Sequence, residues 1–235
     1  MVGGDIVLQL LQRGQAPQSI RIVDFQVLSR LDMVERAKGC DFVRADMASS
    51  ASVEAAFSKP WPASEARKPL TVFHTAAMIH PGDRSERLYP RMRRVNVDGT
   101  VNVLKASQEA GADIFIATSS ASISFRPLGP WIWPWQSTPA NYLHIASERD
   151  FDAPIRPHRL FFSNYSKSKA EAERLVCGSN KPGFRTGAIR PCNAIYGQKT
   201  DPVVGLTLQM GKTATWMPHV IQYAAASVPH LLFYS

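Results

Sequence analysis

Tyr165 and Lys169 stand four residues apart in the segment SNYSKSKAEAERL, and together they could carry out a proton transfer. The Lys, Glu and Ala content predicts a helix, and the spacing of four places the phenol and the ammonium on one face of it. A phenol has a pKa near ~10, but a neighbouring ammonium favours its ionised form. Ser120, at the end of the serine-rich strand IFIATSSAS, could hold the oxygen of an alcohol or ketone while Tyr165 takes or gives its proton. This is the chemistry of a nicotinamide-dependent dehydrogenase.

Tyr and Lys also meet at this spacing by chance on ordinary amphipathic helices, so the surrounding elements decide what the pair means. The first residues, GGDIVLQLLQRG, predict a helix that begins at glycines, and the next apolar segment, SIRIVDF, predicts a strand ending at Asp24. A glycine at a helix start, followed about 20 residues later by an acidic strand end, is the second half of a dinucleotide-binding fingerprint. Asp24 would bond the ribose hydroxyls and repel a 2′-phosphate, which predicts NAD rather than NADP.

The first half of that fingerprint, a strand followed by two further glycines, would precede Gly3. In a doubly wound sheet of order 3-2-1-4-5-6 this strand is central, and the loop after it binds the pyrophosphate at the start of the helix. We therefore expect a Rossmann-type parallel sheet that lacks its first strand and has a gap in its hydrogen-bonded ladder.

Strands and helices continue to alternate along the chain. Strands are predicted for CDFVRADM, which ends at Asp46, for PLTVFHTAAMIH, which runs into Ala76, for IFIATSSAS and for FRTGAIRPCNAIYG, which leads to Pro191. Helices are predicted for SVEAAF, for YPRMRRVNVDGTVNVLKASQEAG and for the segment with Tyr165. Strands separated by helices of this length favour βαβ units, and therefore an α/β fold with a doubly wound parallel sheet.

Five segments in this order, VFHTAAM, RRVNVDGTVNVLKAS, ATSSAS, NYSKSKAEAE and IRPCNAIYG, resemble the extended short-chain dehydrogenase/reductase family. The resemblance is to its 3β-hydroxysteroid dehydrogenase branch, which includes the decarboxylating sterol-4α-carboxylate 3-dehydrogenases. It implies that Ser120 orients the reacting oxygen, that Tyr165 is the general acid/base, and that Lys169 lowers the tyrosine pKa and binds the nicotinamide ribose. Asn96 would lie in the helix that supports the active site, where a purely structural hydrogen bond is an equal alternative. The implied NAD site is lined by Gly3, Asp24, Asp46, Ala76, Tyr165, Lys169 and Pro191.

The resemblance divides the chain into an NAD-binding domain at 1–197 and a remnant of a smaller substrate domain at 198–235. We therefore expect the chain to be truncated at both ends. Between Ser120 and Tyr165, the segment RPLGPWIWPWQSTPANYLHI holds Trp131, Trp133 and Trp135 among prolines. Aromatic rings with polar handles favour a boundary between water and an apolar phase. This segment could cap a flat lipophilic substrate, touch a membrane surface or fold over its own tryptophans.

Composition narrows the class of protein. The 235 residues are 45% hydrophobic, which allows one sizeable core, and the net charge of +8 is scattered along helices without a stacking motif. This charge pattern favours a solvated surface first, an anionic membrane surface next and nucleic acid a distant third, so we expect no nucleic-acid partner. The cysteines, Cys40, Cys177 and Cys192, are isolated, and the histidines show no metal-ligand spacing, so we expect reduced thiols and no metal site. His74, in an apolar strand, is expected to be a satisfied core residue.

The resemblance thus implies NAD-dependent oxidation of a 3β-hydroxyl on a sterol or triterpenoid, in sterol or fungal nortriterpenoid biosynthesis. If the substrate carries a 4α-carboxylate, the new 3-ketone makes it a β-keto acid, which loses carbon dioxide without a further catalytic residue. The expected partner is a small lipophilic polycyclic substrate, with a second copy of the chain as a further candidate. The sequence shows no signal peptide and no apolar span of about 20 residues, so we expect a cytoplasmic protein or one at the cytosolic face of the endoplasmic reticulum.

Two alternatives stay open. The chain could belong to another enzyme of the extended family, such as a sugar-nucleotide epimerase or a flavonoid-type reductase, for which NADP preference or nucleotide-sugar binding would be evidence. It could also be an inactive remnant of the fold that acts through protein contacts.

Overall fold

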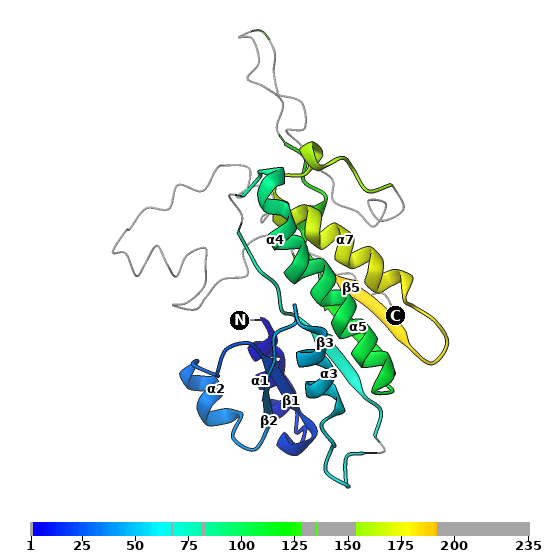
Figure 1. Cartoon of the computed structure of the whole chain (residues 1–235). Coiled ribbons are helices and arrows are strands. Elements are labelled where there is room, and N and C mark those ends of the chain that lie inside the picture. The colour runs from blue at the N-terminus through cyan, green and yellow to red at the C-terminus, as the bar shows by residue number, and fades with distance from the viewer. Residues whose placement is uncertain (1, 67, 81–82, 128–134, 136–153, 192–235) are drawn as a thin grey trace.

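The computed structural model describes residues 2–66, 68–80, 83–127, 135 and 154–191, and every element below lies within them (Figure 1). The strands are β1 (Arg21–Asp24), β2 (Asp41–Arg44), β3 (Thr71–His74), β4 (Ile114–Thr118) and β5 (Arg185–Ile189). The helices are α1 (Val2–Gln12), α2 (Leu31–Arg36), α3 (Ser50–Ser58), α4 (Tyr89–Arg93), α5 (Gly99–Glu109) and α7 (Asn164–Gly178). A π-helical turn (Arg94–Asp98) joins α4 to α5. The predicted alternation of strands and helices, and with it the α/β class, is confirmed.

The described strands are parallel and form two sheets. In the first sheet β1 pairs with β2, and Asp24 lies opposite Arg44. In the second sheet β4 lies between β3 and β5, and Ile114 lies opposite Thr71 on one side and Arg185 on the other. The orders β2-β1 and β3-β4-β5 reproduce the doubly wound order with a break between β1 and β3. The break falls at the position of the expected gap.

Each sheet has its own hydrophobic core. Helices α5 and α7 lie side by side across the β3-β4-β5 sheet (Figure 1). With α3 they enclose a core centred on the fully buried Phe115 of β4, together with Leu104 of α5 and Val176 of α7. A smaller core joins α1 and α2 through Leu8 and Met33. The sheet that carries Ser120 therefore has the larger buried core.

Helix α7 begins directly after its capping residue, Ser163. The hydroxyl of Ser163 accepts a hydrogen bond from the amide of Ser166 at 3.2 Å, which satisfies one of the free amides of the first turn. This cap fixes Tyr165 in the first turn and Lys169 one turn further on. The predicted helix is thereby confirmed, and so is the common face of the two residues.

Two elements differ from the sequence-based expectation. Strand β2 ends at Arg44, so Asp46 lies in the loop after the strand and does not end it. The backbone turns there because the Asp46 carboxylate accepts the amide of Ala48 at 2.9 Å, while the Asp46 amide donates to the hydroxyl of Ser52. The short helix α2 was not predicted, since Met33 is its one buried residue and gives no periodic pattern.

Some expectations concern residues outside the described part of the chain. Trp131, Trp133 and the proposed substrate domain at 198–235 belong to this group, as does the domain boundary at 197. Trp135 is described, and its side chain is exposed. Among the described helices, none combines the length and the apolar character that crossing a bilayer requires.

Candidate active site

The residues predicted to carry chemistry lie at the carboxyl ends of the parallel strands. Asp24 is the last residue of β1, Asp46 follows β2, Ala76 follows β3, Ser120 follows β4 and Pro191 follows β5. Parallel strands present their carboxyl ends at one edge of a sheet, and open α/β sheets bind their ligands there. The predicted set thus gathers along the edge where this fold places a cofactor.

Two close contacts each link a helix that packs on one sheet to the chain that follows a strand of the other sheet. Gly3, in the first turn of α1, is so close to the end of β3 that a Cβ there would lie 2.6 Å from the Thr75 hydroxyl. Beyond β2, the carbonyl of Met47 accepts a hydrogen bond from Asn102 Nδ2 of α5 at 2.9 Å. Gly3 thus permits close packing between a helix start and a strand end, which is the role of the third glycine in the dinucleotide-binding fingerprint.

Ser120, Tyr165 and Lys169 meet at the end of β4. The Ser120 hydroxyl lies 2.9 Å from Oγ of Ser122 and interacts with the phenol of Tyr165. Lys169 Nζ donates to the carbonyl oxygen of Thr118 at 2.7 Å and lies 6.0 Å from the centre of the Tyr165 ring. The structure therefore brings together the residues that the sequence proposed as a catalytic group.

Burial governs the pKa values in this group. It raises the pKa of Tyr165, and the interaction with Ser120 offsets only part of this rise. It lowers the pKa of Lys169 to about 8, although the charge of Glu173 acts in the opposite direction. The net shift of the Tyr165 pKa is therefore upward in this structure, opposite to the lowering expected from Lys169. Desolvation dominates, and the ammonium donates its hydrogen bond to the Thr118 carbonyl.

Asn96 lies in the π-helical turn and connects helix α7 to the loop after β3. Its side chain is buried, and its amide oxygen accepts from the Met78 amide at 2.7 Å. Its amide nitrogen donates to the Met78 carbonyl at 3.0 Å and to the hydroxyl of Ser168 at 2.9 Å. Ser168 directly precedes Lys169. These contacts support the structural reading of Asn96, in which it positions the helix that carries the catalytic group.

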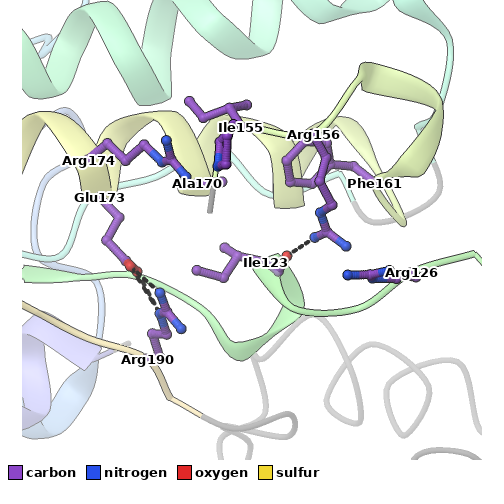
Figure 2. Close-up of a pocket in the computed structure, with 10 residues that line it drawn as sticks. Ile123, Arg126, Ile155, Arg156, Phe161, Ala170, Glu173, Arg174 and Arg190 are labelled. Carbon is purple, nitrogen blue, oxygen red and sulfur yellow. Dashed lines mark hydrogen bonds and ion pairs between the residues drawn. The ribbon is translucent and has the colours of Figure 1, made fainter. Parts of the chain in front are cut away.

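Sequence reasoning missed a buried ion pair one turn beyond Lys169. Glu173 is 5% exposed, and its carboxylate accepts a hydrogen bond from the hydroxyl of Ser119. It also accepts from Arg190, at 2.5 Å from Nη2 and at 3.0 Å from Nε. Figure 2 shows this pair facing a small pocket on the flank of α7. Glu173 continues the four-residue spacing of Tyr165 and Lys169, a signal that could have revealed it.

His74 is a second buried titratable group near Lys169. Its Nε2 lies 3.0 Å from Oγ1 of Thr100, and its ring packs 5.8 Å from the ring of Phe115. Burial and the charge of Lys169 lower the pKa of His74 to about 3. The prediction that His74 is a satisfied core residue is confirmed.

This low pKa predicts a loss of stability in acid. Between about pH 6.5 and pH 3 the unfolded chain protonates this histidine and the folded chain does not, so stability falls as pH falls. The contribution is about 1.4 kcal/mol per pH unit across that window. We expect His74→Gln to flatten the pH dependence of the free energy of unfolding, measured by urea denaturation at pH 6.5, 5.5 and 4.5. Equal slopes for the two proteins would contradict the assignment.

The chain matches the model of the 3-beta hydroxysteroid dehydrogenase/isomerase family over residues 1–133, and it belongs to this family. It is 27% identical over 190 residues to the decarboxylating sterol-4-alpha-carboxylate 3-dehydrogenase erg26 of Schizosaccharomyces pombe, a match that covers 80% of this chain and 46% of the relative. It is 30% identical over 148 residues to the decarboxylating sterol-4-alpha-carboxylate 3-dehydrogenase of Homo sapiens, covering 60% of this chain and 32% of the relative. The chain thus spans less than half the length of these relatives.

Solved structures support the fold. The UDP-glucose 4-epimerase of Thermus thermophilus, in complex with NAD, superposes with a TM-score of 0.55 at 23% identity, covering 81% of this chain and 51% of that one. The enzyme WbmG of Bordetella bronchiseptica, in complex with NAD and UDP, superposes with a TM-score of 0.57 at 20% identity, covering 91% and 58%. At these identities the likeness shows the Rossmann-type fold alone.

Proposed function

We propose that the protein to which this chain belongs oxidises a 3β-hydroxyl on a sterol or triterpenoid with NAD as the oxidant. The observation that carries the proposal is the group of Ser120, Tyr165 and Lys169 at the carboxyl end of β4, in a chain of the 3-beta hydroxysteroid dehydrogenase/isomerase family. The two relatives named above, which are described as sterol dehydrogenases, support the substrate class.

The proposed chemistry assigns one task to each side chain. The Ser120 hydroxyl donates a hydrogen bond to the substrate oxygen and holds it beside the phenol. Tyr165 accepts the hydroxyl proton as the carbonyl forms, and the ammonium of Lys169 stabilises the charge that the tyrosine carries as base. NAD, when bound, supplies the acceptor for the hydride that leaves the carbinol carbon. Hydride and proton together account for the oxidation of the alcohol to a ketone.

We further propose that a substrate with a 4α-carboxylate loses it after this oxidation. The 3-ketone places a carbonyl β to the carboxylate, so the bond between C4 and the carboxyl carbon breaks and its electron pair passes into an enolate. Carbon dioxide leaves, and a proton from water returns the enolate to the ketone. This step needs no residue beyond those that hold the ketone oxygen.

The residues at the edge of the first sheet fit the ribose end of NAD. Asp24 is exposed at the end of β1, and its Oδ1 accepts the amide of Gln26 at 2.8 Å, which fixes the carboxylate at the strand end. Arg44, opposite it in the register, donates to the carbonyl of Phe25 at 3.0 Å and lies over the Phe25 ring. Asp24 therefore presents a fixed and exposed carboxylate, which can accept hydrogen bonds from the ribose hydroxyls.

The proposal is tested by incubating the purified protein with NAD and a 4α-carboxylated 3β-hydroxysterol, while NADH absorbance and released carbon dioxide are followed together. Equal amounts of both products are expected. A 3β-hydroxysterol without the carboxylate should give NADH alone. If neither sterol yields NADH while UDP-glucose is epimerised, the sterol assignment is wrong.

Asp24→Ala should relax cofactor choice. The unmodified protein is expected to prefer NAD, because the Asp24 carboxylate would repel the 2′-phosphate of NADP. Removing one repulsive charge contact should raise kcat/KM for NADP about tenfold relative to NAD. The measurement is the ratio of kcat/KM for the two cofactors. Glu35→Ala serves as the control, since Glu35 is an exposed carboxylate that pairs with Lys38 at 2.6 Å and lies outside the predicted NAD site, and we expect it to leave the ratio unchanged. Equal kcat/KM for both cofactors before mutation would remove Asp24 from the ribose site.

A further inference from the structure

We propose that Glu173 is a positioning residue, which fixes a negative charge one helical turn beyond Lys169 and so holds Lys169 in its charged form. The inference rests on the proposed role of Lys169 and adds a residue that the catalytic group does not include. The inference is drawn from the buried contacts that Glu173 makes with Ser119 and Arg190.

The carboxylate of Glu173 is immobilised on both oxygens. Oε2 accepts from the Ser119 hydroxyl and from Arg190 Nε, and Oε1 accepts from Nε and Nη2 of the same guanidinium (Figure 2). Ser119 directly precedes Ser120, and Arg190 directly precedes Pro191. A carboxylate held by two strand ends cannot turn towards solvent, so its charge stays at a fixed place on α7.

The surroundings of Lys169 explain why such a charge matters. Lys169 is 6% exposed, and its hydrogen bond goes to a neutral acceptor, the Thr118 carbonyl. His74 of β3, which is neutral, and the Tyr165 ring of α7 also face it. Glu173 is the negatively charged group that raises the pKa of Lys169, and both of its carboxylate oxygens are bound by Arg190 at the strand end. Burial disfavours an ammonium, and a fixed carboxylate opposes that effect.

The test is a direct titration of Lys169 by NMR, through the 13Cε shift of labelled lysine, with the signal assigned by its loss in Lys169→Arg. The wild-type midpoint is expected near pH 8. Glu173→Gln should lower the midpoint by about 1 pH unit. Glu171→Gln is the matched control on the same helix, where Glu171 pairs with Lys167 at 2.9 Å, and it should leave the midpoint unchanged.

Removing one partner of a buried ion pair can unfold a domain. The double variant Glu173→Gln/Arg190→Met removes both charges, and it should fold and show a midpoint that is lowered, though by less than in Glu173→Gln because the Arg190 charge is lost as well. An unchanged midpoint in either folded variant overturns the proposal. Failure of both variants to fold would assign Glu173 to the stability of the fold and overturn it as well.

A second readout applies to protein that turns over a 3β-hydroxysterol with NAD. In Glu173→Gln the alkaline limb of the kcat profile should move to lower pH, because Lys169 loses its proton earlier. A merely structural role would lower kcat at all pH values without moving the limb. The titration needs no turnover, so wild-type protein that is inactive but shows the shifted midpoint would contradict the proposed function and leave the role of Glu173 supported.

Discussion

Replacing Tyr165 with Phe should reduce turnover about 10²- to 10⁴-fold, the usual contribution of general acid–base assistance. The variant loses the hydroxyl group that interacts with Ser120 and keeps the aromatic ring that lies near Lys169. NAD binding should therefore remain nearly intact. Lys169→Met should weaken both turnover and NAD binding, because the ammonium has a role in each. The measurements are kcat by NADH absorbance and the NAD dissociation constant by calorimetry.

A matched control exists on a neighbouring helix. Tyr89 of α4 is also buried, and Tyr89→Phe removes the same hydroxyl at a position outside the catalytic group. We expect it to change kcat far less than Tyr165→Phe does. A Tyr165→Phe protein with more than about a third of wild-type activity on an alcohol substrate would remove Tyr165 from the role of general acid/base.

The second large effect is expected from filling the break between the two sheets. A protein in which an apolar β-strand and a Gly-x-x-Gly turn lead directly into Met1, so that Gly3 becomes the third glycine of the fingerprint, should melt at a higher temperature and bind NAD saturably. In the described chain β1 and β3 do not pair with each other, and Val23 and Phe73 within them are 39% and 41% exposed. Central strands of parallel sheets are normally buried on both faces, so a strand here would cover these side chains and complete the ladder.

The size of this effect follows from backbone hydrogen bonding. Each buried polar group left without a partner costs about 1–3 kcal/mol, against a total stability of roughly 5–15 kcal/mol. For a chain of this length, about 1 kcal/mol shifts the melting temperature by roughly 2–4 °C. Thermal melts with and without NAD would compare the extended protein with the unextended chain and with a chain that carries an extension of equal length made of Gly and Ser. A cooperative melt with a clear NAD-induced shift in the unextended chain would show that the break matters little.

Local patterns in the sequence were enough to predict the fold class and to predict that Ser120, Tyr165 and Lys169 lie together. Alternating apolar segments predicted the strands, because parallel strands are short and apolar and the helices between them are amphipathic. The spacing of Tyr165 and Lys169 predicted their common face, because a four-residue interval is nearly one helical turn. The position of Ser120 followed from the same logic, since all parallel strands end at one edge.

Contacts between residues far apart in the chain could not be read from spacing. Glu173 meets Ser119 across 54 positions and Arg190 across 17, and only folding brings the three together. The direction of the Tyr165 pKa shift was missed for a related reason. It depends on how deeply the phenol is buried, which a sequence does not state, whereas the presence of a nearby lysine is evident from the pattern.

The π-helical turn at Arg94–Asp98 places an extra residue between α4 and α5 without turning the two helices out of phase. A π turn holds about one residue more than an α turn, so the 5 residues of this turn cover nearly the same rotation as about four residues of an α-helix. A deletion within the turn would therefore restore the α pitch and leave Thr100 beside His74. The deletion would remove the bulge that contains Asn96, so the loss of a single residue would uncouple Asn96 from Ser168 of α7 while α5 keeps its orientation.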